Sequence, residues 1–106
     1  MKDVSQNQPV IERLDANQFV VKGELNMQTV PALAETAHAM LTQARGDLSV
    51  DLSQVSRADS AGLVFLIDLQ RLARRQQCTI QFRHLPDQLS QILHLSELDE
   101  ILPIQA

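Results

Sequence analysis

The segment Asp59-Ser60-Ala61-Gly62 carries the richest chemistry in this chain of 106 residues. It stands between an apolar strand pattern and an apolar helix pattern, so it is expected to open the helix. Either Asp59 or Ser60 can accept a hydrogen bond from an orphan backbone N–H at that helix start. The same amides can instead meet a phosphate or a polar group of a partner. A structural cap, an anion or partner contact and a nucleophilic serine are therefore the interpretations to weigh.

The rest of the chain contains no clear set of catalytic or metal-binding residues. Asp51 and Asp59 are explained more simply as a strand-end acid and a helix cap than as an acid–base pair. Ser60 is not set in a Gly-x-Ser-x-Gly elbow. No Cys or carboxylate stands at metal-ligand spacing from the histidines, which are His38, His84 and His94. The three glycines form no P-loop or Rossmann pattern, so we expect no enzyme activity, no metal and no cofactor.

Composition indicates one small globular domain, with 44% hydrophobic and 21% charged residues. A net charge of −4 and an aromatic content of 3% argue against nucleic-acid binding. No apolar run approaches the roughly 18–20 residues of a membrane span, and the N-terminus lacks an apolar signal region. The single Cys78 fits a buried thiol in a reducing compartment. We expect a cytoplasmic protein without direct membrane insertion.

Hydropathy patterns predict the element order ββαβαβα with a possible final strand. This order is typical of an α/β domain in which helices pack on a mixed sheet. The expected strands cover residues 10–14, 19–25, 48–52 and 78–82, and the last one 101–104. The expected helices cover residues 29–45, 60–77 and 86–94. Residues 1–8 are expected to be a flexible lead-in, and residues 9–106 to form the domain.

Local residues suggest how some of these elements begin and end. Asp15-Ala16-Asn17 is suited to a hairpin turn between the first two strands. Thr29 can cap the first helix, with Pro31 in its first turn. Gly46 is expected to be the C-terminal cap of that helix.

The helix after Asp59 is expected to present two different faces. At about 100° per residue, one side is apolar and faces the core; its members are Gly62, Phe65, Leu66, Leu69, Leu72 and Ala73. The opposite side is mixed; its members are Ser60, Val64, Ile67, Asp68, Arg71 and Arg75, with Leu63 near the margin. An apolar strip rimmed by charge is typical of a docking surface, and a neutral surface is the alternative. Arg57 either pairs with Asp59 or reaches a partner.

Taken together, these segments resemble the STAS domain family, named for sulfate transporters and anti-sigma factor antagonists. The resemblance rests on the strand Leu48–Leu52, the turn Asp59-Ser60-Ala61-Gly62-Leu63 and the upstream Gly23-Glu24-Leu25-Asn26. It extends from about Val10 to Ile104. It implies that the turn and the helix after it face a partner; the expected contact or regulatory residues are Asp59, Ser60, Ala61, Gly62, Leu63, Val64, Ile67 and Arg71.

One group of free-standing STAS domains contains anti-sigma factor antagonists. These bind a serine kinase and are switched by phosphorylation in this turn. They usually carry two adjacent hydroxyl residues before the glycine, whereas here Ala61 follows Ser60. They also commonly have Asp where this chain has Asn26.

The other group contains the STAS subunit of the Mla phospholipid ABC transporter. Its turn reads Asp-Thr/Ser-Ala-Gly, as Asp59 to Gly62 do, and its leucine-rich stretch resembles Ser90–Leu95. Resemblance to this group implies a cytoplasmic accessory subunit, held at the inner membrane through its partner. That partner is the transporter's ATPase subunit, in a complex with permease and substrate-binding subunits that maintains outer-membrane lipid asymmetry. We expect this function, with an antagonist phosphorylated at Ser60 as the alternative.

Overall fold

The computed structural model describes residues 9–96 and 104–105. Five strands and three helices alternate along this part of the chain; their bounds are β1 Val10–Arg13, β2 Gln18–Leu25, α1 Val30–Thr42, β3 Asp47–Ala58, α2 Ser60–Arg75, β4 Thr79–Arg83, α3 Asp87–Ser96 and β5 Ile104–Gln105. The predicted order, including a final strand, is confirmed. The lead-in at residues 1–8 and the first part of the expected last strand, residues 101–103, lie outside the described residues.

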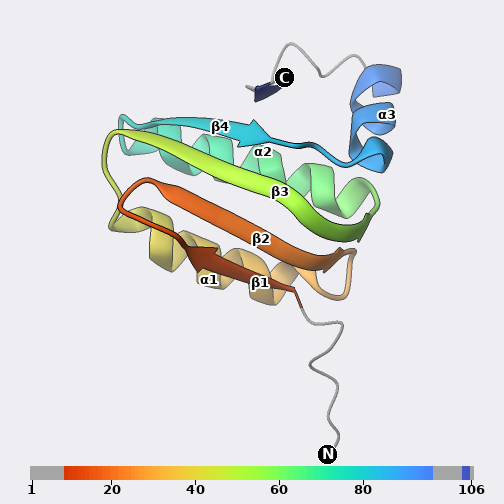
Figure 1. Ribbon diagram of the computed structural model, residues 1–106, viewed down its shortest axis with the longest axis horizontal. Coiled ribbons are helices and arrows are strands. Elements are labelled where there is room, and N and C mark those ends of the chain that lie inside the picture. The colour runs from red at the N-terminus through yellow and green to blue at the C-terminus, as the bar shows by residue number, and fades with distance from the viewer. Residues whose placement is uncertain (1–8, 97–103, 106) are drawn as a thin grey trace, which may run out of the picture.

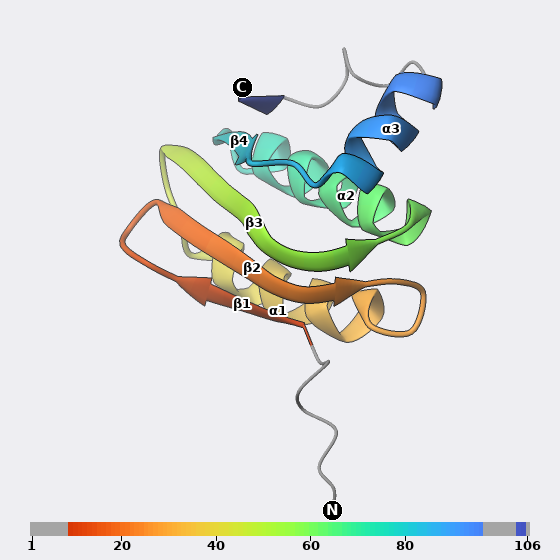
Figure 2. The same ribbon diagram turned by 45° about the vertical axis from the view of Figure 1, so that its right-hand side comes forward.

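The strands form one mixed sheet in the order β1-β2-β3-β4-β5. β1 runs antiparallel to β2, and each of the other neighbouring pairs is parallel. α1 and α2 lie side by side on one face of this sheet, and α3 lies near the start of α2 (Figures 1 and 2). Because β2, β3 and β4 are parallel, both connecting helices start at the same end of the sheet.

The hairpin between β1 and β2 forms where the sequence predicts it. The carboxylate Oδ1 of Asp15 accepts a hydrogen bond of 2.9 Å from the backbone N–H of Asn17. The backbone N–H of Leu14 donates to the carbonyl of Gln18 at 2.7 Å and closes the turn. An Asp side chain that bonds to the backbone two residues ahead is a recognised turn former.

β3 is longer than the expected strand at residues 48–52, which is therefore corrected to Asp47–Ala58. The reason is tertiary, because β2 continues to pair with β3 as far as Leu25 opposite Ala58. Two register irregularities, each of which places one extra residue in β3, keep the pairing going past the segment Ser53–Ser56. Alternation alone could not reveal this extension. It carries the chain directly to Asp59 at the end of the sheet.

α1 ends at Thr42, three residues before the expected end, and Gly46 is not its cap. The backbone N–H of Gln43 bonds back to the carbonyl of Met40, so the last turn tightens and stops the helix. Gly46 instead has a φ of 86° in the turn that leads into β3. The side-chain amide of Asn17 lies against this turn, and an added Cβ on Gly46 would sit 3.3 Å from its nitrogen.

The core lies between the sheet and the two connecting helices. The apolar face predicted for α2 is confirmed, since Phe65, Leu66, Leu69 and Ala73 are almost completely buried. From α1, Leu33, Ala37 and Leu41 pack into the same cluster. Cys78 is also buried, as expected for a small apolar residue.

Asp51 is a half-buried acid on the sheet face that α1 and α2 leave open. Its Oδ1 accepts hydrogen bonds of 2.9 Å from the backbone N–H of Ser53 and from the Nδ1 of His84. Burial raises the pKa of Asp51, but hydrogen bonds from Ser53 and His84 outweigh this and hold the pKa below its usual 3.8. Asp51 is therefore engaged by Ser53 and His84 and does not form an acid–base pair with Asp59.

This lowered pKa predicts an acid-dependent loss of stability. The folded state favours the charged carboxylate, so its contribution is present above pH 3.8 and is lost as the pH falls through the lower folded pKa. The variant Asp51→Asn should therefore have a lower free energy of unfolding than the wild type at about pH 5. We expect the difference to shrink by about pH 2, as measured by urea unfolding at each pH. A difference that stays constant with pH would contradict the assignment.

Candidate docking site

The turn before α2 is a structural cap, and Asp59 rather than Ser60 forms it. Oδ1 of Asp59 accepts a hydrogen bond of 2.8 Å from the backbone N–H of Ala61. The backbone N–H of Asp59 donates to the carbonyl of Leu25 at 3.1 Å, which ties the turn to the end of β2. The side chain of Gln88 on α3 accepts from the N–H of Ala58 at 2.9 Å. Because the cap carboxylate already fills the helix start, the turn is poorly suited to hold a phosphate.

Gly62 lets α2 approach the sheet closely. A Cβ at this position would lie 3.2 Å from the Cβ of Leu25 and 3.3 Å from the Cβ of Ala58. Neither of those atoms is the flexible end of a long side chain, so a larger residue would push the start of α2 outward. Gly62 therefore sets the height of Ser60 above the sheet.

Beside Ser60, the starts of α1 and α2 enclose an open, mostly apolar depression of about 370 Å³. We call it the Ser60 depression; its lining residues are Met27, Val30, Pro31, Ser60, Ala61 and Val64. Two large apolar side chains are strongly exposed there, with Met27 80% and Val64 61% accessible. Exposed apolar side chains grouped around one polar group are typical of a docking site.

Met27, which is not among the contact residues expected from the sequence, comes from the loop between β2 and α1. This loop is held by side-chain hydrogen bonds, since Oδ1 of Asn26 accepts from the backbone N–H of Gln28 at 2.8 Å and of Thr29 at 3.0 Å. Thr29 occupies the N-cap position of α1 as predicted, but its side chain makes no cap hydrogen bond. Its hydroxyl instead donates to the carbonyl of Glu24 at 2.7 Å and so braces the loop. The sequence did hold a signal for an exposed apolar contact: a methionine between two polar residues, in the short segment that joins an expected strand to an expected helix.

The structure divides the other predicted contact residues into exposed and covered ones. Ser60, Val64 and Arg71 are exposed, and Ala61 is partly so. Gly62 and Leu63 are buried, so they can support the surface but do not form it in this conformation. Ile67 is half-buried and packs against the core, so the expectation that it lies on the outer side needs correction.

Arg57 does not pair with Asp59. In the part of the chain that the structure describes, the ion pairs are Lys22–Glu12, His38–Asp68 and His84–Asp51. Among the same residues, no group of three His, Cys, Asp or Glu side chains could hold a metal ion. Residues 9–96 and 104–105 also contain no helix long and apolar enough to cross a membrane.

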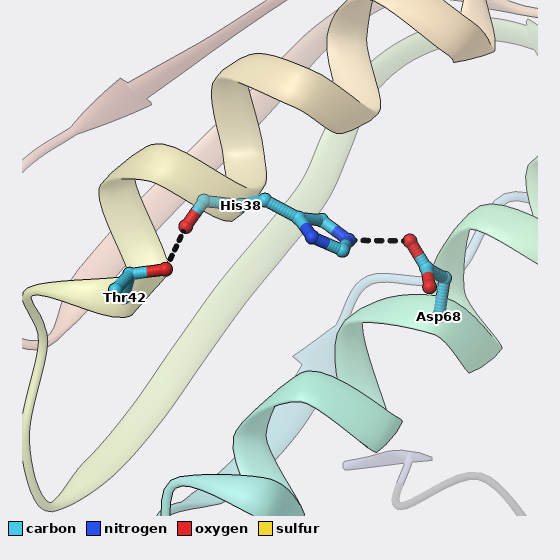
Figure 3. Close-up of polar contacts among 3 residues, drawn as sticks. All are labelled: His38, Thr42 and Asp68. Atoms are coloured by element: carbon cyan, nitrogen blue, oxygen red, sulfur yellow. Dashed lines mark hydrogen bonds and ion pairs between the residues drawn. The ribbon is translucent and has the colours of Figure 1, made fainter.

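His38 and Asp68 join the two helices beyond the Ser60 depression. The Nε2 of His38 on α1 lies 2.6 Å from Oδ2 of Asp68 on α2, and the two side chains point toward one another (Figure 3). The hydroxyl of Thr42 donates to the carbonyl of His38 one turn further along α1. A second link follows, in which the side-chain amide of Gln76 donates to the carbonyl of Leu41 at 3.2 Å. These contacts hold α1 and α2 as one platform.

Comparison with known proteins identifies the family. The family model described as "Mlab, STAS domain" matches residues 12–103. The chain therefore belongs to the STAS domain family, as the resemblance implies. The match covers the hairpin from Glu12 onward, both connecting helices and the Ser60 depression.

Similar proteins include several anti-sigma factor antagonists. The chain is 27% identical over 104 residues to the anti-sigma-B factor antagonist of Bacillus subtilis, covering 98% of this chain and 89% of that protein. An anti-sigma factor antagonist from Mycobacterium paratuberculosis has a similar fold, with a TM-score of 0.70, 24% identity, and coverage of 92% of this chain and 83% of that chain. An anti-sigma-factor antagonist (STAS) domain protein from Planctomyces limnophilus gives a TM-score of 0.69, 18% identity and coverage of 90% and 88%.

Proposed function

We propose that this STAS domain is a non-enzymatic docking subunit, which binds one partner protein through the Ser60 depression and controls it. The observation that carries the proposal is the exposure of Met27 and Val64 beside the Ser60 hydroxyl. Both apolar side chains stand on rigid supports, one on a hydrogen-bonded loop and the other on a capped helix. A pre-organised apolar contact loses little conformational freedom when a partner binds.

The names of the relatives support an anti-sigma factor antagonist as the first class of function. In that case the partner is a serine kinase of the anti-sigma type, and Ser60 is the phosphoacceptor. The hydroxyl of Ser60 is exposed at the start of α2, where a kinase can reach it. A phosphate there would add a charge of about −1.5 to −2 beside Val64 and the carboxylate of Asp59. Such a charge would oppose apolar docking, so phosphorylation would release the partner.

Two observations favour a second class, the STAS subunit of a phospholipid ABC transporter. The matched family model carries the description of the Mla-type STAS domain, and Ala61 removes the second hydroxyl that antagonists usually have. In that case the partner is the transporter's ATPase subunit, and the domain is cytoplasmic. The names of the relatives support the first class more directly, but both classes use the same docking surface.

Capture from the bacterium that encodes the chain separates the two classes. A tagged wild-type domain and its Val64→Asp variant are expressed at native level, cross-linked and purified in parallel, and the recovered proteins are identified by mass spectrometry. A serine kinase enriched only with the wild type supports the antagonist, and phosphopeptide mapping then examines Ser60. An ABC ATPase with its permease supports the transporter subunit. Equal recovery of all proteins by both baits would contradict docking at this surface.

A further inference from the structure

The outer face of α2 continues beyond the Ser60 depression as a stripe of exposed side chains. Ser60, Val64, Arg71 and Arg75 are all exposed and lie within a narrow sector, opposite the buried face of the helix. At 1.5 Å per residue, Arg71 lies about 10 Å beyond Val64 along the helix, and Arg75 about 16 Å beyond it. The stripe therefore begins with an apolar anchor and ends with two cations.

The described part of the chain supplies no carboxylate to these two arginines. α1 and α2 contain one acid each, Glu35 and Asp68. Asp68 is engaged by His38 at 2.6 Å. Because α1 and α2 run side by side with His38 level with Asp68, Glu35 lies about 9 Å nearer the helix starts than Arg71. Within residues 9–96, neither Arg71 nor Arg75 forms an ion pair.

The order of apolar and basic residues along the stripe indicates which side chains a partner segment must carry. One apolar side chain can enter the Ser60 depression, and carboxylates two to three helical turns further along the same segment can face Arg71 and Arg75. Arginine suits this role because its planar donors pair with carboxylates in a fixed geometry. The chain as a whole carries a net charge of −4, so these local cations would set the position of an acidic segment more than attract it from afar.

We infer that the occupant of this surface is an acidic amphipathic helix of the partner protein, with its apolar face on Met27 and Val64 and its carboxylates on Arg71 and Arg75. The inference rests on the proposed function and names the partner's chemistry. The anionic lipid surface is the main competing occupant, because an apolar anchor with nearby arginines also suits a membrane. The small number of cations favours the protein segment, because segments that bind anionic lipid usually carry clusters of about four to eight Lys or Arg residues, whereas this stripe carries Arg71 and Arg75 alone.

The test measures affinity for the purified kinase or ABC ATPase recovered by the capture experiment, by isothermal titration at low and high salt. The test variant is a double charge reversal that combines Arg71→Glu and Arg75→Glu. The variant Val64→Asp tests separately whether the partner docks at the Ser60 depression. Arg74→Glu is the matched control, because Arg74 is an exposed arginine of the last turn that lies toward β4 beside Cys78 and Ile80. Reversing Arg74 changes the charge at the helix end without altering the stripe.

We expect the double reversal to weaken binding about tenfold or more at low salt, and the loss to shrink at high salt, while Arg74→Glu binds within about twofold of the wild type. An effect of Val64→Asp without any effect of the double reversal would overturn this inference and leave the proposed function standing. No effect of either would overturn both. Wild-type binding to phosphatidylglycerol vesicles that the double reversal abolishes, with unchanged affinity for the protein, would assign the stripe to a membrane and also overturn the inference.

Discussion

The variant Val64→Asp is expected to weaken binding of the partner protein about a hundredfold or more, while the free domain stays folded. Val64 is 61% exposed on the outer face of α2, so a carboxylate there remains hydrated in the unbound state. In the complex, the same charge would be buried against apolar atoms beside Met27. Central apolar contacts of an interface cost about 2 kcal/mol or more when they are lost, and an unpaired buried charge adds to that.

The matched control for this prediction is Leu14→Asp. Leu14 is 58% exposed, close to the value for Val64, but it stands at the end of the β1–β2 hairpin and outside the Ser60 depression. Leu14→Asp should bind like the wild type, with affinity measured by titration and folding checked by circular dichroism. If both variants bind equally well, or lose affinity equally, the depression is not the docking site.

The variant Phe65→Ala is expected to lower the free energy of unfolding by about 3–5 kcal/mol. Phe65 stands next to Val64 in the sequence but is 1% exposed and belongs to the core between the helices and the sheet. Domains of this kind are stabilised by about 5–15 kcal/mol, so the loss would leave a large share of molecules close to unfolding. Urea unfolding followed by circular dichroism measures the change.

Val64→Ala provides the comparison on the same helix. The two substitutions remove side chains from adjacent positions, one buried and one exposed, so their effects on stability should differ strongly. Val64→Ala should change the unfolding free energy by no more than about 0.5 kcal/mol. Similar losses from both variants would mean that α2 is rotated relative to the sheet. Such a rotation would also remove the basis for placing Val64 in the docking surface.

The docking surface combines two segments that are held in place by different contacts. Met27 is positioned by hydrogen bonds within its own loop, from Asn26 and Thr29. Ser60 and Val64 are positioned by the cap of Asp59 and by the close approach of Gly62 to Leu25. The two segments meet because β2, β3 and β4 run parallel, so that α1 and α2 start at the same end of the sheet.

Short-range features of the sequence were enough to predict most elements and the inner face of α2. Alternation and helical spacing depend on neighbours a few residues apart, so the buried positions Leu66, Leu69 and Ala73 could be identified without a structure. The cap position had two candidates in Asp59 and Ser60, because both residue types accept hydrogen bonds from a helix start. Only the backbone geometry selected Asp59.

Three outcomes depended on contacts between distant parts of the chain. β3 extends to Ala58 because β2 pairs with it, and this pairing is invisible in β3 itself. Leu63 and Ile67 are more covered than a helical wheel of α2 predicts, since a wheel includes no neighbours from outside the helix. His38 meets Asp68 across 30 residues of sequence.

The order of the elements, most of the core residues and the polar turn at Asp59-Ser60-Ala61-Gly62 could therefore be predicted from the chain alone, because these follow from local spacing and residue type. Which apolar residues stay exposed around Ser60 depended on how the elements pack in the folded chain. This packing brought Met27 beside Val64, two residues that are far apart in the chain, and it covered Leu63. Exposure depends on what packs against a residue, and those neighbours come from other helices and strands.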